Sequence, residues 1–194
     1  MKQFQKSTLI HLATAALCLP FAAATAHAQT MVHAISGTVV SVMPNLKMIE
    51  VQTDDGADSH FQWVRSDKDK IEFDKNVSAD STEVKSSAVK GNHIIVYYFG
   101  DGDPRIAVAL KDLGTTAQVE TGTVVKLDRH DHTLILKNDS GAAVTFHLDP
   151  KTVGDTAGGV SENFKYDFDK GKYIRVIYTQ ADGAQTAWFI SSGL

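Results

Sequence analysis

The chain contains a single cysteine, Cys18, and it lies within residues 1–28. This leading segment has two early lysines followed by the apolar run LIHLATAALCLPFAAATAHA, which is typical of a secretory signal peptide. The small residues Ala26 and Ala28 predict cleavage before Gln29. A chain that begins at Gln29 contains no thiol, which excludes disulfides, thiolate metal sites and cysteine nucleophiles.

A long hydrophobic run is also absent. His11 and Pro20 interrupt the apolar segment, which falls short of the roughly 20 apolar residues that a membrane-spanning helix needs. A lipid anchor would need a small residue before Cys18, and Leu17 is not small. We therefore expect no membrane span and a periplasmic or secreted protein.

The sequence has no excess of basic residues. It carries 23 acidic residues against 19 basic ones, for a formal net charge of −4. Nucleic-acid binding draws on a concentrated basic face, so we expect no nucleic-acid partner. There is no GxSxG or comparable nucleophile turn either, so we predict that the protein is not an enzyme and has no cofactor.

What the sequence does contain is a repeated pattern. The tetrapeptide GTVV occurs at residues 37–40 and again at residues 122–125. Further matches follow each copy in the same order, namely Asp54, Gly56 and Phe61 with Asp139, Gly141 and Phe146, and Lys90-Gly91 with Lys170-Gly171. These matches predict a tandem duplication of a unit of about 80 residues, which is an ordinary size for a small domain.

Each unit is expected to form five short strands. Its apolar runs are rich in β-branched and aromatic residues and are bounded by Gly, Asp, Asn and Pro. A meander of three strands, a variable excursion and a closing hairpin predict an all-β fold of two tandem small five-stranded OB-like or SH3-like barrels. A helix is expected at most over residues 80–90. The expected divisions are residues 1–28 as signal peptide, 32–114 as first barrel and 115–194 as second barrel.

The same positions carry a resemblance. GxV near the start of each unit, a glycine turn, KGxxIxV before the fourth strand and alanine in the last strand resemble exported bacterial small-barrel domains of unknown function. These motifs are structural glycines and core positions. The resemblance implies an OB-like barrel and an exported location, and it implies no catalytic residue.

The most suggestive polar stretch is DRHDH, from Asp128 to His132. If the second unit folds as a meander, the end of its third strand returns to this stretch and brings Asp149 close to His132. Imidazoles and carboxylates are ligands for zinc, copper or nickel, so Asp128, His130, His132 and Asp149 form a candidate metal site. The alternative is a polar solvated turn, since His-x-His alone is less specific than the spaced ligand sets of zinc motifs.

Histidines and aromatic residues elsewhere give weaker signals. Four histidines stand alone in the sequence, and His60 and His147 are expected on the polar faces of strands, beside Phe61 and Phe146. Aromatic residues either line an open binding face or fill the cores and an interface between the two units. They are Phe61, Trp63, Tyr97, Tyr98 and Phe99 in the first unit, and Phe164, Tyr166, Phe168, Tyr173, Tyr178, Trp188 and Phe189 in the second.

These observations favour a non-catalytic exported binding or scaffold module. Its partner would be a protein, peptide or glycan, which the sequence does not distinguish. The alternative is a periplasmic metal-handling protein or a hydrolase that uses the turn at His130 and His132. A group of converging His and Asp side chains would favour this alternative.

Overall fold

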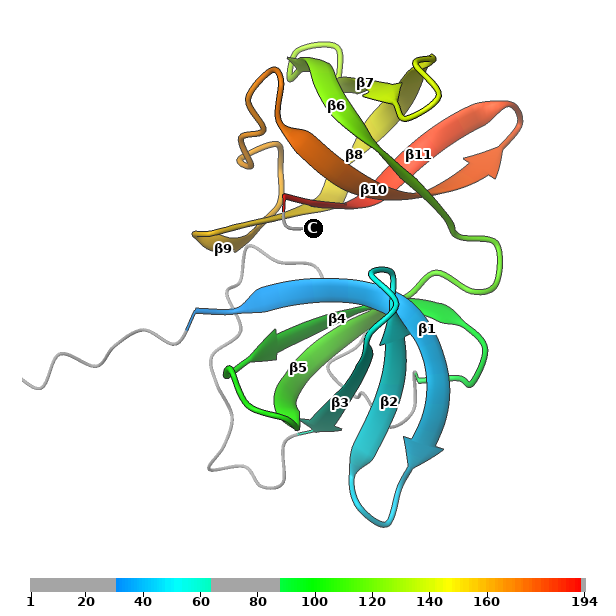
Figure 1. Ribbon diagram of the computed structural model, residues 1–194, viewed down its shortest axis with the longest axis vertical. Helices are drawn as coiled ribbons and strands as arrows, with labels where there is room; N and C mark the ends of the chain where they lie inside the picture. The colour runs from blue at the N-terminus through cyan, green and yellow to red at the C-terminus, as the bar shows by residue number, and fades with distance from the viewer. Residues whose placement is uncertain (1–30, 64–87, 193–194) are drawn as a thin grey trace, which may run out of the picture.

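The protein is built entirely from strands within the residues that the computed structural model describes, 31–63 and 88–192 (Figure 1). The first five are β1 His33–Met43, β2 Met48–Thr53, β3 Asp58–Trp63, β4 His93–Phe99 and β5 Arg105–Asp112. The other six are β6 Gln118–Asp128, β7 Thr133–Asn138, β8 Ala143–Thr156, β9 Gly159–Ser161, β10 Tyr173–Ala181 and β11 Ala184–Ser191. No helix that could cross a membrane occurs in these two stretches of chain.

The strands close into two barrels of the same design. In the first, the order is β1-β2-β3-β5-β4, with β1 pairing to both β2 and β4 and with β3 parallel to β5. In the second, β6, β7 and β8 form the meander, and β11 closes the barrel by pairing in parallel with β8. This is the arrangement of an OB-type barrel, so the predicted all-β fold with two small barrels is confirmed.

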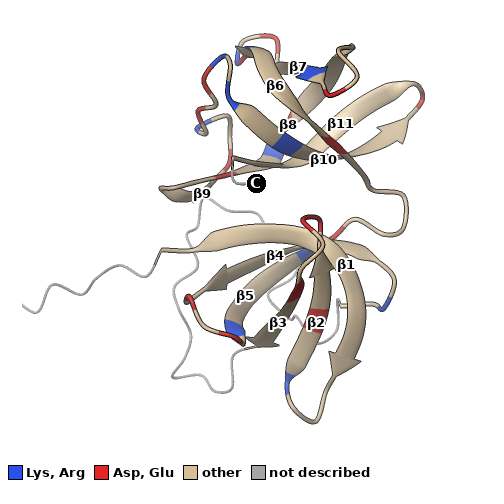
Figure 2. Cartoon of the chain, viewed as in Figure 1, with Lys and Arg blue, Asp and Glu red and all other residues tan. Residues whose placement is uncertain are grey.

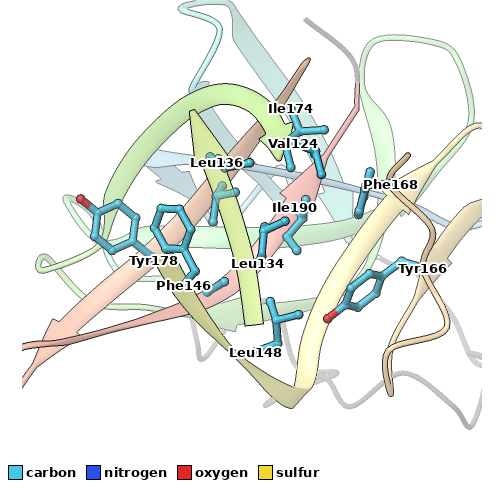
Figure 3. Packing of buried hydrophobic residues seen from close by; sticks show 12 residues of the cluster. Val124, Leu134, Leu136, Phe146, Leu148, Tyr166, Phe168, Ile174, Tyr178 and Ile190 are labelled. Carbon is cyan, nitrogen blue, oxygen red and sulfur yellow. The ribbon is translucent and has the colours of Figure 1, made fainter. Parts of the chain in front are cut away.

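Alternation of buried and exposed residues explains why these segments are strands. In β2 and β7, every second residue points into a barrel, which is the period of a strand with one buried face. Phe61 and Phe146 are completely buried at matching positions of the two barrels. Figure 3 shows the second core, in which side chains from β6, β7, β8, β10 and β11 converge around Leu134 and Phe146.

The two GTVV segments occupy matching places in β1 and β6. Each ends in a bulge, between Val39 and Ser41 in β1 and between Val124 and Lys126 in β6. Each glycine lies against the backbone of the neighbouring strand. A Cβ on Gly37 would lie 2.7 Å from the Cα of Thr53, and one on Gly122 would lie 2.9 Å from the Cα of Asn138. Glycine is needed at both corners because only glycine allows the strands this close.

A third apolar cluster joins the barrels. The first barrel contributes residues from β1, β4 and β5, and the second contributes residues from β8, β10 and β11. The buried members are Ala34, Ile95, Tyr97, Ala109, Val153, Ile177 and Phe189. Each barrel therefore has its own core, and the two share one apolar interface.

Some predictions concern other parts of the chain. The signal peptide, residues 1–28, and most of the helix expected over residues 80–90 lie outside the described residues. The chain passes from β5 to β6 through residues 113–117, which contain the expected junction. In the view of Figure 2, acidic and basic residues are interspersed over the described parts of both barrels.

Candidate functional site

The outward face of β8 organises the contact between the barrels. Side chains two residues apart lie on the same face of a strand, so Asp149, Lys151, Val153 and Asp155 face outward. Val153 belongs to the apolar cluster, and Asp155 contacts His33 of the first barrel. Asp149 and Lys151 line a groove that also includes residues of β5. Along β8, the interface thus passes from a polar groove through an apolar centre to a histidine–aspartate pair.

The groove encloses a volume of about 370 Å³. This is within the range of about 300–1,000 Å³ that is common for small-molecule sites. Both barrels line it. The first contributes Lys111 and Asp112 at the end of β5 and Leu113 directly after it, and the second contributes Asp149, Lys151, Thr179 and Trp188. The site therefore exists only because the barrels pack against each other.

Trp188 is held in place by a hydrogen bond and a cation. Its indole N–H donates to the hydroxyl oxygen of Thr179 at 2.8 Å. The ammonium nitrogen of Lys111 lies 4.5 Å from the centre of the indole ring, which is a cation–π distance. Lys111 is only 4% exposed, so this contact is a fixed part of the boundary between the barrels.

The groove's two carboxylates are tied to nearby turns. Asp112 accepts hydrogen bonds at 2.8 Å from the side-chain amide of Asn92 and from the backbone N–H of Gly114. Asp149 Oδ1 accepts one from the backbone N–H of Lys151. Asp149 therefore stands in a defined orientation, and the groove presents charges of both signs.

The candidate metal ligands at the turn from Asp128 to His132 have other partners. The ammonium of Lys126 lies 2.6 Å from Asp128 and holds the pKa of that carboxyl at about 2, helped by the backbone N–H groups of Asp131 and His130. The same carboxylate accepts those N–H groups at 3.0 Å, as in an Asx turn. Asp128 thus forms the turn from β6 to β7.

The two histidines of this turn differ. Both are exposed, but the His132 ring stacks on Phe164 with centroids 4.1 Å apart and an interplanar angle of 7°. His132 has a φ of 51°, and Lys47 has a φ of 54° at the matching position of the first barrel. The backbone conformation of His132 therefore belongs to the shared hairpin design.

Asp149 follows Leu148, whose N–H donates to the carbonyl of His132, so the backbones meet as the sequence suggested. The Asp149 side chain, however, lines the groove between the barrels. In the described parts of the chain, no group of three or more His, Cys, Asp or Glu side chains is placed to hold a metal ion. The metal site at Asp128, His130, His132 and Asp149 stays a prediction.

Replacing His130 or His132 with alanine is expected to change the free energy of unfolding by different amounts. We expect His132→Ala to lower the free energy of unfolding by about 1 kcal/mol, because it removes an aromatic stack. We expect His130→Ala to change it by less than about 0.5 kcal/mol, as for other surface substitutions. Chemical denaturation measures both. Stoichiometric zinc that survives dialysis of the wild type, and is lost when both histidines are replaced, would instead support the metal site.

Sequence reasoning missed three histidine–aspartate pairs, each formed by a histidine that stands alone in the sequence. His33 lies 3.1 Å from Asp155, and His60 lies 3.2 Å from Asp103. His147 is exposed, and it lies on the outer face of β8 as expected.

The third pair belongs to a polar cluster that recurs in both barrels. In the first, Asp54 accepts a hydrogen bond from Ser36 and lies 3.2 Å from His93 Nε2. In the second, Asp139 accepts hydrogen bonds from Thr121 at 3.0 Å and from Tyr173 at 2.9 Å. The repeat pattern places these two sets at matching positions, so aligning the polar residues of the two units would have revealed the cluster.

The aromatic residues largely fill cores and the interface. Tyr97 and Phe189 are buried in the apolar cluster between the barrels, and Trp188 is partly buried beside it. Phe61, Phe146, Tyr166 and Phe168 are buried within the individual barrels. Tyr173 is the exception among the large aromatics of the second unit, with 43% of its surface exposed. Trp188 is the aromatic residue that lines the groove.

Known proteins give a limited likeness. The crystal structure of Ag(I)CusF is 13% identical with a TM-score of 0.32, and the match covers 40% of this chain and 97% of that chain. An apo-CusF structure from Escherichia coli also gives 13% identity and a TM-score of 0.32, with 40% of this chain and 88% of that chain covered. No family model and no curated protein sequence matches the chain. The chain's own strand pairing carries the assignment of the fold.

Proposed function

We propose that the protein is a non-catalytic exported binding module whose ligand lies in the groove between the two barrels. The observation that carries this proposal is the composition of that groove, which combines an oriented indole ring with side chains of both charges. Such a set of a few positioned polar groups beside an apolar surface is what small-molecule sites share. Export is supported by the signal-peptide pattern of residues 1–28.

The charges favour a zwitterionic ligand, such as a short peptide with free ends. Lys151 offers an exposed ammonium to a terminal carboxylate, and Asp149 offers its second carboxylate oxygen to a terminal amine. Leu113 and the indole of Trp188 supply apolar surface for a side chain. Because the ammonium of Lys111 already covers one face of the indole, that face is closed to a stacking sugar ring.

The test is an NMR titration that follows the indole N–H of Trp188, whose hydrogen bond to Thr179 makes it sensitive to the groove. Trialanine is the zwitterionic probe, N-acetyl-trialanine amide is the matched uncharged peptide, and maltotriose is the neutral glycan. We expect trialanine to shift the indole signal and the capped peptide to bind more weakly. Lys151→Glu should weaken trialanine binding by about tenfold or more, because it places like charge against the carboxylate.

Lys137→Glu is the matched control, since Lys137 is an exposed lysine of the same barrel on β7. It should leave trialanine binding unchanged. A shift caused by maltotriose alone would keep the groove as the site and replace the peptide with a glycan. If none of the three probes shifts the indole signal, the proposal that this groove binds such ligands is wrong.

A further inference from the structure

The interface contains one histidine–aspartate pair that joins the two barrels. His33 Nδ1, on β1, lies 3.1 Å from Asp155 Oδ1 and 3.3 Å from Oδ2, on β8. The backbone N–H of Ala34 donates to the same carboxylate. Close by, the N–H of Val160 donates to the carbonyl of Val32 at 3.0 Å. This edge of the interface is thus formed by direct polar contacts between the barrels.

The other histidine–aspartate pairs lie inside the first barrel. His60 and Asp103 belong to β3 and to the turn before β5, and they are 3.2 Å apart. His93 and Asp54 are also 3.2 Å apart within that barrel. Of the three pairs, only His33 and Asp155 connect one barrel to the other.

Burial makes the charge on Asp155 costly. The Asp155 side chain is 15% exposed and the His33 side chain is 33% exposed. Burial raises the pKa of the Asp155 carboxyl, and the nearby imidazole of His33 opposes this shift without cancelling it. The residues paired with Asp155 on the adjacent strands, Val160 and Ser191, carry no charge. Beside the backbone N–H groups of Ala34 and Thr156, His33 is the side chain that offsets the buried carboxylate.

The other titratable groups near His33 lie around Tyr98, the residue that pairs with His33 across β1 and β4. The two rings are 6.3 Å apart, and the guanidinium of Arg105 lies 4.8 Å from the centre of the Tyr98 ring. Burial raises the pKa of the Tyr98 hydroxyl, and the charges of Asp155 and Asp101 act in the same direction. Histidine is the side-chain type that ordinarily changes charge between about pH 5 and 8, whereas tyrosine stays neutral and arginine stays charged in that range.

We propose that His33 and Asp155 form a pH-sensitive link between the barrels, which is tight in mildly acidic solution and weakens as the imidazole loses its proton. While His33 is protonated, the pair carries opposite charges. After deprotonation, a largely buried carboxylate faces a neutral ring, and its desolvation is no longer offset by a positive charge. The link does not depend on the proposed ligand.

The titrations of His33 and Asp155 both weaken the contact between the barrels as pH rises. The pKa of Asp155 is raised in the folded protein, so its contribution is present at low pH and is lost as pH rises through that pKa. The contribution of a protonated histidine beside a carboxylate is likewise lost as pH rises through the titration of the histidine. Contact between the barrels is therefore expected to loosen steadily from acidic to alkaline solution.

Hydrogen exchange of the Val160 amide tests this link, because that N–H is bonded across the interface. We expect its protection factor, corrected for intrinsic exchange, to fall about 3- to 10-fold between about pH 5.5 and about pH 8. In His33→Gln, protection at acidic pH should be lower than in the wild type, and the fall over this range should be smaller, because only the titration of Asp155 remains. His60→Gln is the matched control, and it should keep the fall seen in the wild type.

The amide of Gly171 reports on folding in each variant, because it donates to the carbonyl of Val124 within the second barrel. It should stay protected throughout. If the Gly171 amide loses its protection in His33→Gln, the variant Asp155→Asn is used instead. Its amide keeps the shape of the carboxyl and also removes the pH dependence. A constant Val160 protection factor in the wild type, or an undiminished fall in the folded variants, would overturn the proposal.

Discussion

Replacing Gly122 with alanine is expected to destabilise the second barrel by about 3 kcal/mol or more, near the upper end for overpacking a closed site. The added Cβ would lie 2.9 Å from the Cα of Asn138 and would also press on the carbonyl group of Lys137. Both obstacles are backbone atoms of β7, so the barrel cannot relieve the clash by rotating a side chain. Gly37→Ala meets the backbone of Gln52 and Thr53 in the same way, and a comparable loss is expected.

Chemical denaturation followed by circular dichroism measures both losses. Gly102→Ala and Gly158→Ala are the matched controls, because an added Cβ meets nothing within 4 Å at Gly102 and only the Thr156 hydroxyl, at 3.6 Å, at Gly158. These controls should stay within about 0.5 kcal/mol of the wild type. A loss at Gly122 no larger than at Gly158 would show that the GTVV corner is not a close approach of two strands.

Truncation of Phe189 to alanine is expected to cost about 3–5 kcal/mol, the range for removing a buried aromatic side chain. Phe189 is 1% exposed and lies in the apolar cluster between the barrels, not in the core of either one. The variant should therefore weaken the coupling of the barrels as well as the total stability. We expect thermal unfolding to separate into two transitions where the wild type shows one.

Val119→Ala is the control for this prediction, since Val119 is an apolar residue of the second barrel that is 42% exposed. It should change the free energy of unfolding by less than about 0.5 kcal/mol and leave a single transition. Differential scanning calorimetry distinguishes the outcomes. A Phe189→Ala protein that loses stability but still unfolds in one transition would argue that the apolar cluster is not what couples the barrels.

The fold could be predicted from sequence because its signals are local. Alternation in segments such as residues 48–53 and 133–138 has the period of a strand with one buried face. Turn residues such as Gly56 and Gly141 have the positive φ that turns of this kind require. Because these signals occur twice in the same order, they predicted two barrels. Both barrels have a glycine, Gly37 or Gly122, at the corner where neighbouring strands come close together.

The interface could not be predicted in this way, because it joins residues that are distant in sequence. His33 and Asp155 are 122 positions apart, and no local pattern connects them. Lys111 and Trp188 come from the last strands of the two barrels, and their contact depends on how the barrels pack. From the sequence alone, apolar residues on the outer faces of β4 and β10 are compatible with exposure to solvent, with a ligand-binding face or with an interface between the barrels.

The candidate metal site shows the limit of a short motif. The spacing of His130 and His132 places two imidazoles close in sequence, yet both are exposed and one of them stacks on Phe164. The stacking residue follows Asn163 in a turn where both have positive φ, which no spacing rule anticipates. By contrast, comparing Asp54 with Asp139 and their neighbours across the two units would have found a shared polar cluster.

The NMR signal of the Lys111 ε-methylene group is the most direct test of the central claim, that the barrels pack to form a groove around Trp188. Lys111 comes from the first barrel and Trp188 from the second, and the ammonium lies 4.5 Å from the indole centre. We predict ring-current-shifted ε-methylene protons with nuclear Overhauser effects to the indole, and loss of the shift in Trp188→Leu. An ε-methylene signal at the position of an exposed lysine, unchanged in Trp188→Leu, would contradict the account.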